Sequence, residues 1–279
     1  MNLRKIAVAV SLGMVTLLSA CNPSGDGVAK TKGDDSVLRV GMECDYAPFN
    51  WTQTDEENGY KIAAGGYAGG YDVEIAKRIA DSLDKELEIV KTEWNGLTPA
   101  LTSGKIDLII AGMSPTAERK ETINFSDTYY TSDLVIVVKK DSKYASANSL
   151  ADFKGAKITG QLNTFHYDVI NQIDGVEKSS ALETFPAMIV ALESGKIDGY
   201  ISEKPGAISA TTSNDNLTFV EFDEGDGFET SVEDTSIAVG ISKDNEKLLE
   251  DVNEALKDIS QEEREKIMQE AVENQPLGE

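Results

Sequence analysis

Two stretches of this chain repeat one pattern: LTSGKIDLII at residues 101–110 and LESGKIDGYI at residues 192–201. In both stretches a helical run ends at a glycine, a lysine follows, and an apolar run typical of a buried strand begins. A helix that leads into such a strand is the repeating unit of α/β folds. Its recurrence in the second half of the chain predicts two similar α/β lobes.

Apolar periodicity extends this prediction over the rest of the chain. We expect strands at 37–42, 87–90, 106–111, 134–139, 156–159, 197–202, 217–222 and 235–241. We expect helices at 72–83, 97–103, 150–153, 165–173, 187–194, 245–259 and 261–272. Residues 53–70 combine charges with a Gly, Ala and Tyr cluster, which predicts a surface loop. Strands that alternate with helices predict largely parallel sheets.

The N-terminus has the parts of an export signal. Arg4 and Lys5 precede an apolar run at 6–18, which is shorter than the roughly 20 residues that a membrane-spanning helix needs. Leu18-Ser-Ala-Cys21 follows and resembles a bacterial lipobox, in which the cysteine is lipidated. We therefore predict a lipoprotein signal peptide at 1–20 with a lipid on Cys21. The alternative is an ordinary signal peptide with an incidental cysteine.

The residues after Cys21 predict how the protein is held. Residues 21–36 are rich in Gly, Ser, Asp and Lys, which indicates a flexible tether. The folded part would then be lipid-anchored in the cell envelope, on the extracytoplasmic side of a bacterial membrane. We expect this lipid to be its contact with the membrane.

Composition reduces the number of functional classes to which the chain could belong. The chain has 279 residues, enough for two domains, and a net charge of −23. Such acidity argues against nucleic acid and anionic membrane surfaces as partners and favours cationic small ligands. Only two cysteines are present, so a lipid on Cys21 leaves Cys44 without a disulfide partner. A single histidine, His166, argues against a zinc site and against a Cys–His nucleophile.

Polar residues gather directly after four of the expected strands. They lie at 43–51, 112–119, 160–164 and 203–205. Ligands of open α/β sheets bind beyond the carboxyl ends of strands, so these segments predict one binding site. Each segment also has a purely structural alternative. The segment at 112–119 could simply cap a helix that has proline at its first position. The aromatic side chains of the segment at 43–51 could turn inward, and Glu203 could be a solvated acid.

Several motifs carry a resemblance to a known family. They are GMECDYAPFN at 41–50, GYDVE at 70–74, WNGLTPAL at 94–101, AGMSPTAER at 111–119, FSDTYY at 125–130 and IDGYISE at 197–203. Over about residues 38–267 the chain resembles the polar amino-acid-binding proteins of bacterial ABC importers, extracellular solute-binding protein family 3. The resemblance implies an α/β, two-lobed periplasmic-binding-protein-like (type II) fold with two hinge strands. Lobe I would comprise 37–131 and 226–279, and lobe II would comprise 132–225.

The resemblance also implies how the ends of an amino acid are held. Arg119 would bind the α-carboxylate bidentately, with Ser114 and the backbone N–H of Thr164 completing that site. The carbonyl of Gly112 and the carboxylate of Glu203 would hold the α-ammonium group. Glu203 stands where the family usually has an aspartate, so this contact would shift by one methylene.

The resemblance assigns the side-chain end of the ligand to another set of residues. Tyr46 and Trp94 would sandwich the ligand side chain, with cation–π attraction if that side chain is charged. Glu43 stands where the family has an acid that reaches the head of the side chain, and Asp45 adds a second acid beside it. Two desolvated carboxylates without a cation are costly and repel each other. These charges predict arginine, or next lysine, as ligand.

Three alternatives stay open, and one of them is a sensory or adhesive lipoprotein that binds its ligand without delivering it. A neutral amino acid such as glutamine or cystine could donate to one carboxylate, and some proteins of this fold are similar to dehydratase enzymes. We favour a binding protein without catalytic residues, metal or cofactor, since no nucleophile–base pair or metal cluster is evident. Its expected partners are a free amino acid and the permease of an ABC importer, and we expect a monomer.

Overall fold

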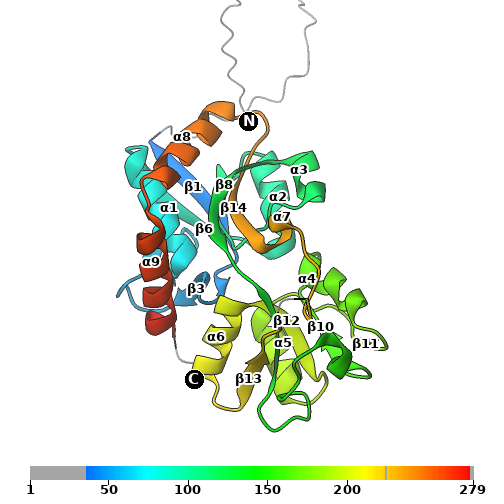
Figure 1. The fold of residues 1–279 in the computed structure, drawn as a ribbon. Helices are drawn as coiled ribbons and strands as arrows, with labels where there is room; N and C mark the ends of the chain where they lie inside the picture. The colour runs from blue at the N-terminus through cyan, green and yellow to red at the C-terminus, as the bar shows by residue number, and fades with distance from the viewer. Residues whose placement is uncertain (1–35, 224, 277–279) are drawn as a thin grey trace, which may run out of the picture. The chain divides into compact units, whose positions relative to one another are not determined.

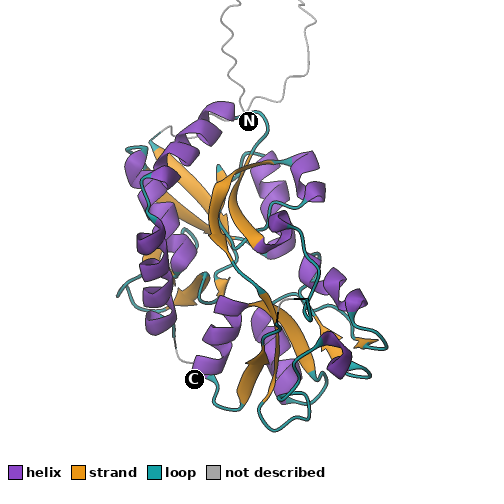
Figure 2. Cartoon of the chain, viewed as in Figure 1, coloured by secondary structure: helices purple, strands orange, loops and turns teal. Residues whose placement is uncertain are grey.

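The computed structural model describes residues 36–223 and 225–276. The predicted signal peptide, Cys21 and nearly all of the tether lie outside the described residues, so lipidation stays a prediction. The described chain forms two five-stranded sheets with helices against them and a smaller four-stranded sheet (Figure 1). Strands and helices alternate along most of this part, as Figure 2 shows. The predicted α/β class is confirmed.

The first five-stranded sheet has the order β6-β1-β7-β14-β8. Its strands are β1 (Val37–Met42), β6 (Glu86–Lys91), β7 (Leu108–Ile109), β8 (Asn124–Thr131) and β14 (Ser236–Ile241). β1 is parallel to β6 and β7, whereas β14 is antiparallel to β7 and β8. The helices of this part are α1 (Tyr71–Ser82), α2 (Trp94–Thr102), α3 (Ala117–Thr122), α7 (Val232–Thr235), α8 (Glu246–Lys257) and α9 (Gln261–Asn274). α8 and α9 pack along α1 (Figure 1).

The second five-stranded sheet repeats this plan in the order β11-β10-β12-β9-β13. Its strands are β9 (Leu134–Lys139), β10 (Lys157–Thr159), β11 (Glu177–Lys178), β12 (Gly199–Glu203) and β13 (Leu217–Val220). Two of its strand pairings are parallel and two are antiparallel, because β9 alone runs opposite to the other four strands. Each sheet is therefore mixed, whereas the sequence predicted largely parallel sheets. Its helices are α4 (Phe165–Asp168), α5 (Phe185–Glu193), α6 (Lys204–Ser213) and 3-10 turns at Leu150–Phe153 and Val169–Gln172.

The repeated sequence pattern corresponds to a repeated structural device. Oδ2 of Asp107 accepts the backbone N–H of Arg39 at 2.9 Å, and Oδ2 of Asp198 accepts that of Lys157 at 2.8 Å. The two aspartates also donate their own N–H groups to the carbonyls of Arg39 and Lys157, at 2.8 and 2.7 Å. Each aspartate thus fastens its strand to the neighbouring parallel strand, which sets the register at the centre of each sheet. The two sheets are built on one plan, as the repeat predicted.

The prediction of a surface loop at 53–70 is wrong. This region contributes to a small antiparallel sheet of β2 (Asp45–Tyr46), β3 (Asn50–Gln53), β4 (Tyr60–Lys61) and β5 (Tyr67–Gly69). The strands are only two to four residues long and are separated by charges and glycines, which hides their periodicity. Burial of Ile62 and Ala68 fastens this sheet to the main core.

Other boundaries differ for local reasons. α2 begins at Trp94, three residues before its expected start, and keeps Pro99 within the helix. The strand expected at 106–111 shrinks to β7, because only its centre pairs with β1 and β14. β8 and α6 were not predicted, since β8 is largely polar and α6 is rich in Ser and Thr.

The chain crosses between the two five-stranded sheets twice. It passes from β8 to β9 through Ser132 and Asp133, and it returns from β13 to β14 through 221–235. The N–H of Ser132 donates to the carbonyl of Thr235 at 3.0 Å, so the two crossings are hydrogen-bonded to each other. No helix in the described part of the chain is long and apolar enough to span a bilayer.

We expect Gly70→Ala to lower the free energy of unfolding by about 3 kcal/mol. Gly70 precedes α1 with φ 123°, and an added Cβ would lie 2.4 Å from the carbonyl oxygen of Phe49. Gly104→Ala is the matched control, because Gly104 has φ +74° but no atom within 4 Å of the added Cβ. The control should lose only about 1 kcal/mol. Urea unfolding measures both, and equal losses would contradict the steric argument.

Candidate functional site

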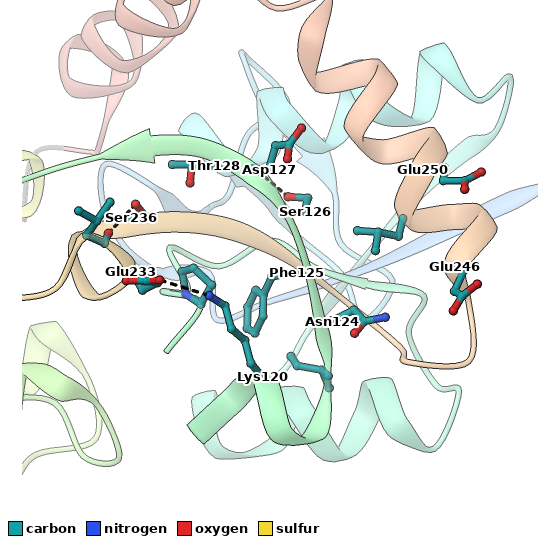
Figure 3. A pocket seen from close by; sticks show the side chains of 14 residues that line it. Lys120, Asn124, Phe125, Ser126, Asp127, Thr128, Glu233, Ser236, Glu246 and Glu250 are labelled. Carbon is teal, nitrogen blue, oxygen red and sulfur yellow. Dashed lines mark hydrogen bonds and ion pairs between the residues drawn. The ribbon is translucent and has the colours of Figure 1, made fainter. Parts of the chain in front are cut away.

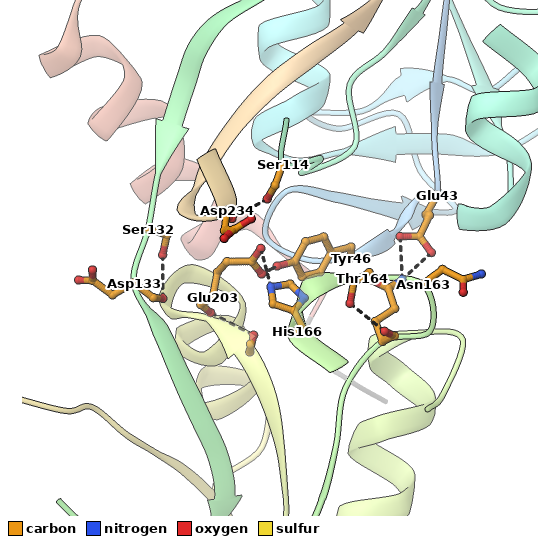
Figure 4. Close-up of polar contacts among 12 residues, drawn as sticks. Glu43, Tyr46, Ser114, Ser132, Asp133, Asn163, Thr164, His166, Glu203 and Asp234 are labelled. Atoms are coloured by element: carbon orange, nitrogen blue, oxygen red, sulfur yellow. Dashed lines mark hydrogen bonds and ion pairs between the residues drawn. The ribbon is translucent and has the colours of Figure 1, made fainter. Parts of the chain in front are cut away.

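The predicted binding segments meet where strands of the two five-stranded sheets end (Figure 4). Hydrogen bonds join the two sides through the pairs Tyr46–Glu203, Glu43–Gln161, Trp94–Asn163 and Arg119–Asn163. A chain of contacts therefore connects most predicted site residues, namely Glu43, Tyr46, Trp94, Gly112, Ser114, Arg119, Thr164 and Glu203. Asp45 is the exception.

Arg119 lies in the first turn of α3. Its guanidinium donates to the carbonyls of Ser114 at 3.0 Å and Asn163 at 3.3 Å, and it lies 4.9 Å from the centre of the Trp94 ring. Burial lowers the pKa of Arg119 to about 10, although nearby acids oppose this shift. No ion pair of Arg119 is found among the described residues. Such a partly buried cation held only by carbonyls can accept a carboxylate.

Two hydroxyls near Arg119 are already engaged. Ser114 donates to the carbonyl of Asp234 at 2.8 Å, and Thr164 donates to the carbonyl of Gln161 at 2.8 Å. Ser114 can therefore accept from a ligand or turn its hydroxyl, but it does not offer a free proton in this arrangement. The cap of α3 is Thr116, so the alternative in which Ser114 caps the helix is wrong.

Glu203 ends β12 and is only 3% exposed. One carboxylate oxygen accepts the hydroxyl of Tyr46, and the other lies 3.0 Å from Nε2 of His166 (Figure 4). Burial alone would raise the pKa of Glu203, but the imidazole and the tyrosine hydroxyl outweigh it and hold that pKa below its usual value. His166 was not predicted as a site residue, although it follows Thr164 closely and is the one histidine of the chain.

Tyr46 and Trp94 do not leave their rings free for the expected sandwich. The Tyr46 ring stacks on Phe185 with centres 4.1 Å apart and planes 12° apart, and the residue is 3% exposed. The Trp94 ring is the one that contacts the Arg119 guanidinium. Gly112 lies against Tyr46 with φ +60°, and a Cβ there would be 3.0 Å from the tyrosine ring. The stack with Phe185 covers one face of the Tyr46 ring, so a ligand side chain would contact the opposite face.

The two acids after β1 have different surroundings. Glu43 is buried, and Nε2 of Gln161 lies 3.2 Å from both of its oxygens. Burial raises the pKa of Glu43 to about 7, with Asp45 adding to the shift and Gln161 and Lys91 opposing it. Asp45 instead pairs with Lys91 at 3.1 Å on the surface, its side chain 44% exposed. The expectation of two unpaired acids is therefore wrong, because Asp45 and Tyr46 are strand neighbours that point to opposite faces.

Surface cavities of the described residues also lie away from Arg119 and Glu203. A cavity of about 800 Å³ runs along β8 and α8 (Figure 3) and is lined by none of the predicted site residues. Another, of about 300 Å³, is bordered by Asp45, Phe185 and Gln275. The described residues contain no group of three or more His, Cys, Asp or Glu that could hold a metal ion. Cys44 is a buried free thiol.

Residues 38–273 match the bacterial extracellular solute-binding proteins, family 3. The chain belongs to this family. It is 31% identical over 247 residues to the arginine-binding extracellular protein ArtP of Bacillus subtilis (strain 168), and the match covers 87% of each chain. It is 28% identical over 253 residues to the L-cystine-binding protein TcyJ of Escherichia coli (strain K12), which covers 90% of this chain and 86% of TcyJ.

A solved structure of an amino-acid-binding protein is also similar to this chain. The amino acid ABC transporter substrate-binding protein AbpA from Streptococcus pneumoniae Canada MDR_19A, bound to L-arginine, superposes with a TM-score of 0.73. It is 27% identical, and the match covers 85% of this chain and 95% of AbpA. The predicted family and the two-lobed periplasmic-binding-protein-like fold are confirmed. This family member is an extracytoplasmic amino-acid-binding protein of an ABC transporter and not an enzyme, so the dehydratase alternative is wrong.

We expect Glu43→Gln to stabilise the fold at pH 8 but hardly at pH 5. A carboxyl group whose pKa is raised by folding binds its proton more tightly in the folded state, so stability falls as pH rises from the unfolded value towards about 7. The gain of the variant over the natural chain should grow by about 2 kcal/mol between these pH values. Urea unfolding at both pH values measures it. Glu56→Gln, at an exposed position, should show no such growth, and a flat difference for Glu43→Gln would contradict the burial argument.

Proposed function

We propose that this family member binds a cationic amino acid, arginine in preference to lysine, and delivers it to the membrane permease of an ABC importer. The observation that carries this proposal is the surroundings of Glu43. It is a buried carboxylate whose hydrogen-bond partner is a neutral amide, that of Gln161. A guanidinium or ammonium group would compensate this charge better than an amide does.

The other end of the ligand has matching chemistry. The carbonyl-held guanidinium of Arg119 would bind the α-carboxylate, and Glu203 with the carbonyl of Gly112 would bind the α-ammonium group. The backbone N–H of Thr164, and the hydroxyl of Ser114 once it turns away from the Asp234 carbonyl, would complete the carboxylate site. Tyr46 and Trp94 would flank the ligand side chain, with Tyr46 using the ring face opposite Phe185. Asp45 is not included, because it pairs with Lys91 on the surface.

We further propose that the chain moves as two lobes. Lobe I comprises residues 37–131 and 226–279, and lobe II comprises residues 132–225. The contacts that cross between these segments involve ligand-site residues, namely Tyr46–Glu203, Glu43–Gln161 and the bonds to the Asn163 carbonyl. A ligand that contacts both segments would favour the closed arrangement by its differential affinity. Closure would present the loaded lobes to the permease.

The proposals for the lipid anchor and for the oligomeric state are based on the sequence alone. We propose that Cys21 carries a lipid that holds a monomer at the extracytoplasmic face of the membrane, because the lipobox and the polar tether precede the folded part. A tethered carrier stays close to the importer, which raises its effective concentration there.

A neutral polar amino acid is the second candidate, with glutamine or cystine as examples. The observation that favours it is the Gln161 contact itself, because a neutral amide already satisfies both oxygens of Glu43. The pKa of Glu43, raised to about 7, also lets it be uncharged at neutral pH. The relative TcyJ is named an L-cystine-binding protein.

Calorimetric titration with L-arginine, L-lysine, L-histidine, L-glutamine and L-cystine should give the tightest binding for arginine, then lysine. Glu43→Gln should weaken arginine about tenfold or more and glutamine by much less, because a charged hydrogen bond is lost only for the cation. Asp45→Asn is the matched control and should change arginine binding less than about twofold. Tighter binding of a neutral amino acid than of arginine and lysine would overturn the cationic preference.

Arg119→Ala should weaken every amino acid that binds by about a hundredfold or more, since the α-carboxylate is common to all of them. Arg119→Lys should recover part of this loss, because it keeps the charge but not the planar fork. The neighbouring Lys120 is exposed and lies 3.9 Å from Glu233, so Lys120→Ala serves as the control and should bind normally. Calorimetry measures all three, and unchanged affinity in Arg119→Ala would refute the proposed carboxylate site.

A further inference from the structure

His166 is a buried histidine that the proposed function leaves without a role. It is 4% exposed, and its Nε2 lies 3.0 Å from Oε1 of Glu203. Among the described residues neither imidazole nitrogen makes a hydrogen bond, so the contact of Nε2 with Glu203 is a close approach of ion-pair type. A buried polar atom of this kind is uncommon and calls for an explanation.

The surroundings of the imidazole leave Glu203 as its one charged contact among the described residues. The rings of Phe165 and Phe185 lie 4.4 and 6.3 Å from the imidazole, centre to centre. Its backbone packs on Gly160, where a Cβ would lie 2.9 Å from the His166 carbonyl. Apolar walls on these sides strengthen the attraction between a charged imidazole and Glu203.

Other titratable groups act on this pair from the neighbouring elements. Tyr46, from the small sheet, donates to the second oxygen of Glu203. Arg119 and Asp72 interact with Glu203 over a longer distance, and Glu43 acts on Tyr46. Asp168, on the same helix as His166, is exposed. Both oxygens of Glu203 are thus engaged by this chain's own groups.

We propose that His166 is a positioning residue of the ammonium site, and that its charged form competes with the ligand's α-ammonium group for Glu203. This inference rests on the proposed function, in which Glu203 receives the ammonium group. A neutral imidazole lies beside Glu203 without neutralising it and leaves its negative charge for the ligand. A charged imidazole neutralises Glu203, so that a bound ammonium group would be a second cation on one carboxylate.

Competition of this kind couples binding to protonation in both directions. Ligand binding drives a proton off His166, and loss of that proton strengthens ligand binding by the same factor. The effect concerns the α-ammonium group and therefore applies to neutral and cationic amino acids alike. It is distinct from titration of Glu43, which affects only the side-chain end.

The chain contains a single histidine, so proton NMR of the mature protein reports on His166 alone when the purification tag has no histidine. The probe is L-arginine, or L-glutamine if arginine does not bind. Saturating ligand should move the titration midpoint of the imidazole to lower pH by about one unit. Asp72, whose pKa burial raises to about 6, has no imidazole protons and so does not contribute to this signal.

A variant pair gives the reciprocal measurement. In Glu43→Gln, which removes the titrating carboxylate of the side-chain end, the affinity for L-glutamine should rise about tenfold between pH 5 and 8. Adding His166→Gln keeps a donor near the position of Nε2, but the glutamine side chain cannot titrate. The rise in affinity between pH 5 and 8 should therefore fall below about twofold. Because a merely structural role would lower affinity equally at all pH values, the pH profile is the deciding measurement.

Three outcomes are decisive. A midpoint that stays in place when an amino acid is bound, or a tenfold rise that persists in the double variant, would overturn the role of His166 and leave the proposed function intact. Absence of binding by every amino acid tested would overturn the proposed function, and this inference with it. If the double variant does not fold, the NMR titration of the natural chain decides alone.

Discussion

Compensation of the Glu203 charge is the constraint on which the site depends. Removing a carboxylate from water costs several kcal/mol unless hydrogen bonds and opposite charge compensate it. Here the compensation comes from Tyr46, which follows β1, and from His166, which follows β10. Glu203 itself ends β12, so three strand ends must meet for the carboxylate to be buried. The neighbouring contacts of Glu43 and Arg119 lie across the same meeting point.

The plan of the fold was accessible from sequence because it rests on local patterns. The repeated LTSGKIDLII and LESGKIDGYI stretches each contain an aspartate that fastens two parallel strands, so the repeat reflects one hydrogen-bonding device used twice. β1 and β9 have the predicted bounds, since both are continuous apolar runs. The rule that ligands lie beyond strand ends then brought Arg119 and Glu203 into one site before any contact was known.

What the sequence could not predict depends on partners distant along the chain. Asp45 pairs with Lys91, Tyr46 stacks on Phe185, and neither partner can be inferred from spacing. Strand alternation at Asp45 and Tyr46 would have shown that their side chains point apart, but a two-residue strand is too short to recognise. His166 had only its rarity as a signal. Its importance appears once α4 is seen to place it against Glu203.

The acidity of the whole chain says little about its ligand. Most of the acids behind the net charge of −23 are exposed, and salt screens exposed charges within about 10 Å. In the proposed function the ligand would instead meet a local balance of charges, with Arg119 and Glu203 at its backbone end and Glu43 at its side-chain end. Any amino acid would satisfy the first two charges, because all amino acids carry both backbone groups. Selection for the charge of the ligand side chain would then fall to Glu43, and its ionisation near neutral pH would decide whether a cation or a neutral amide is preferred.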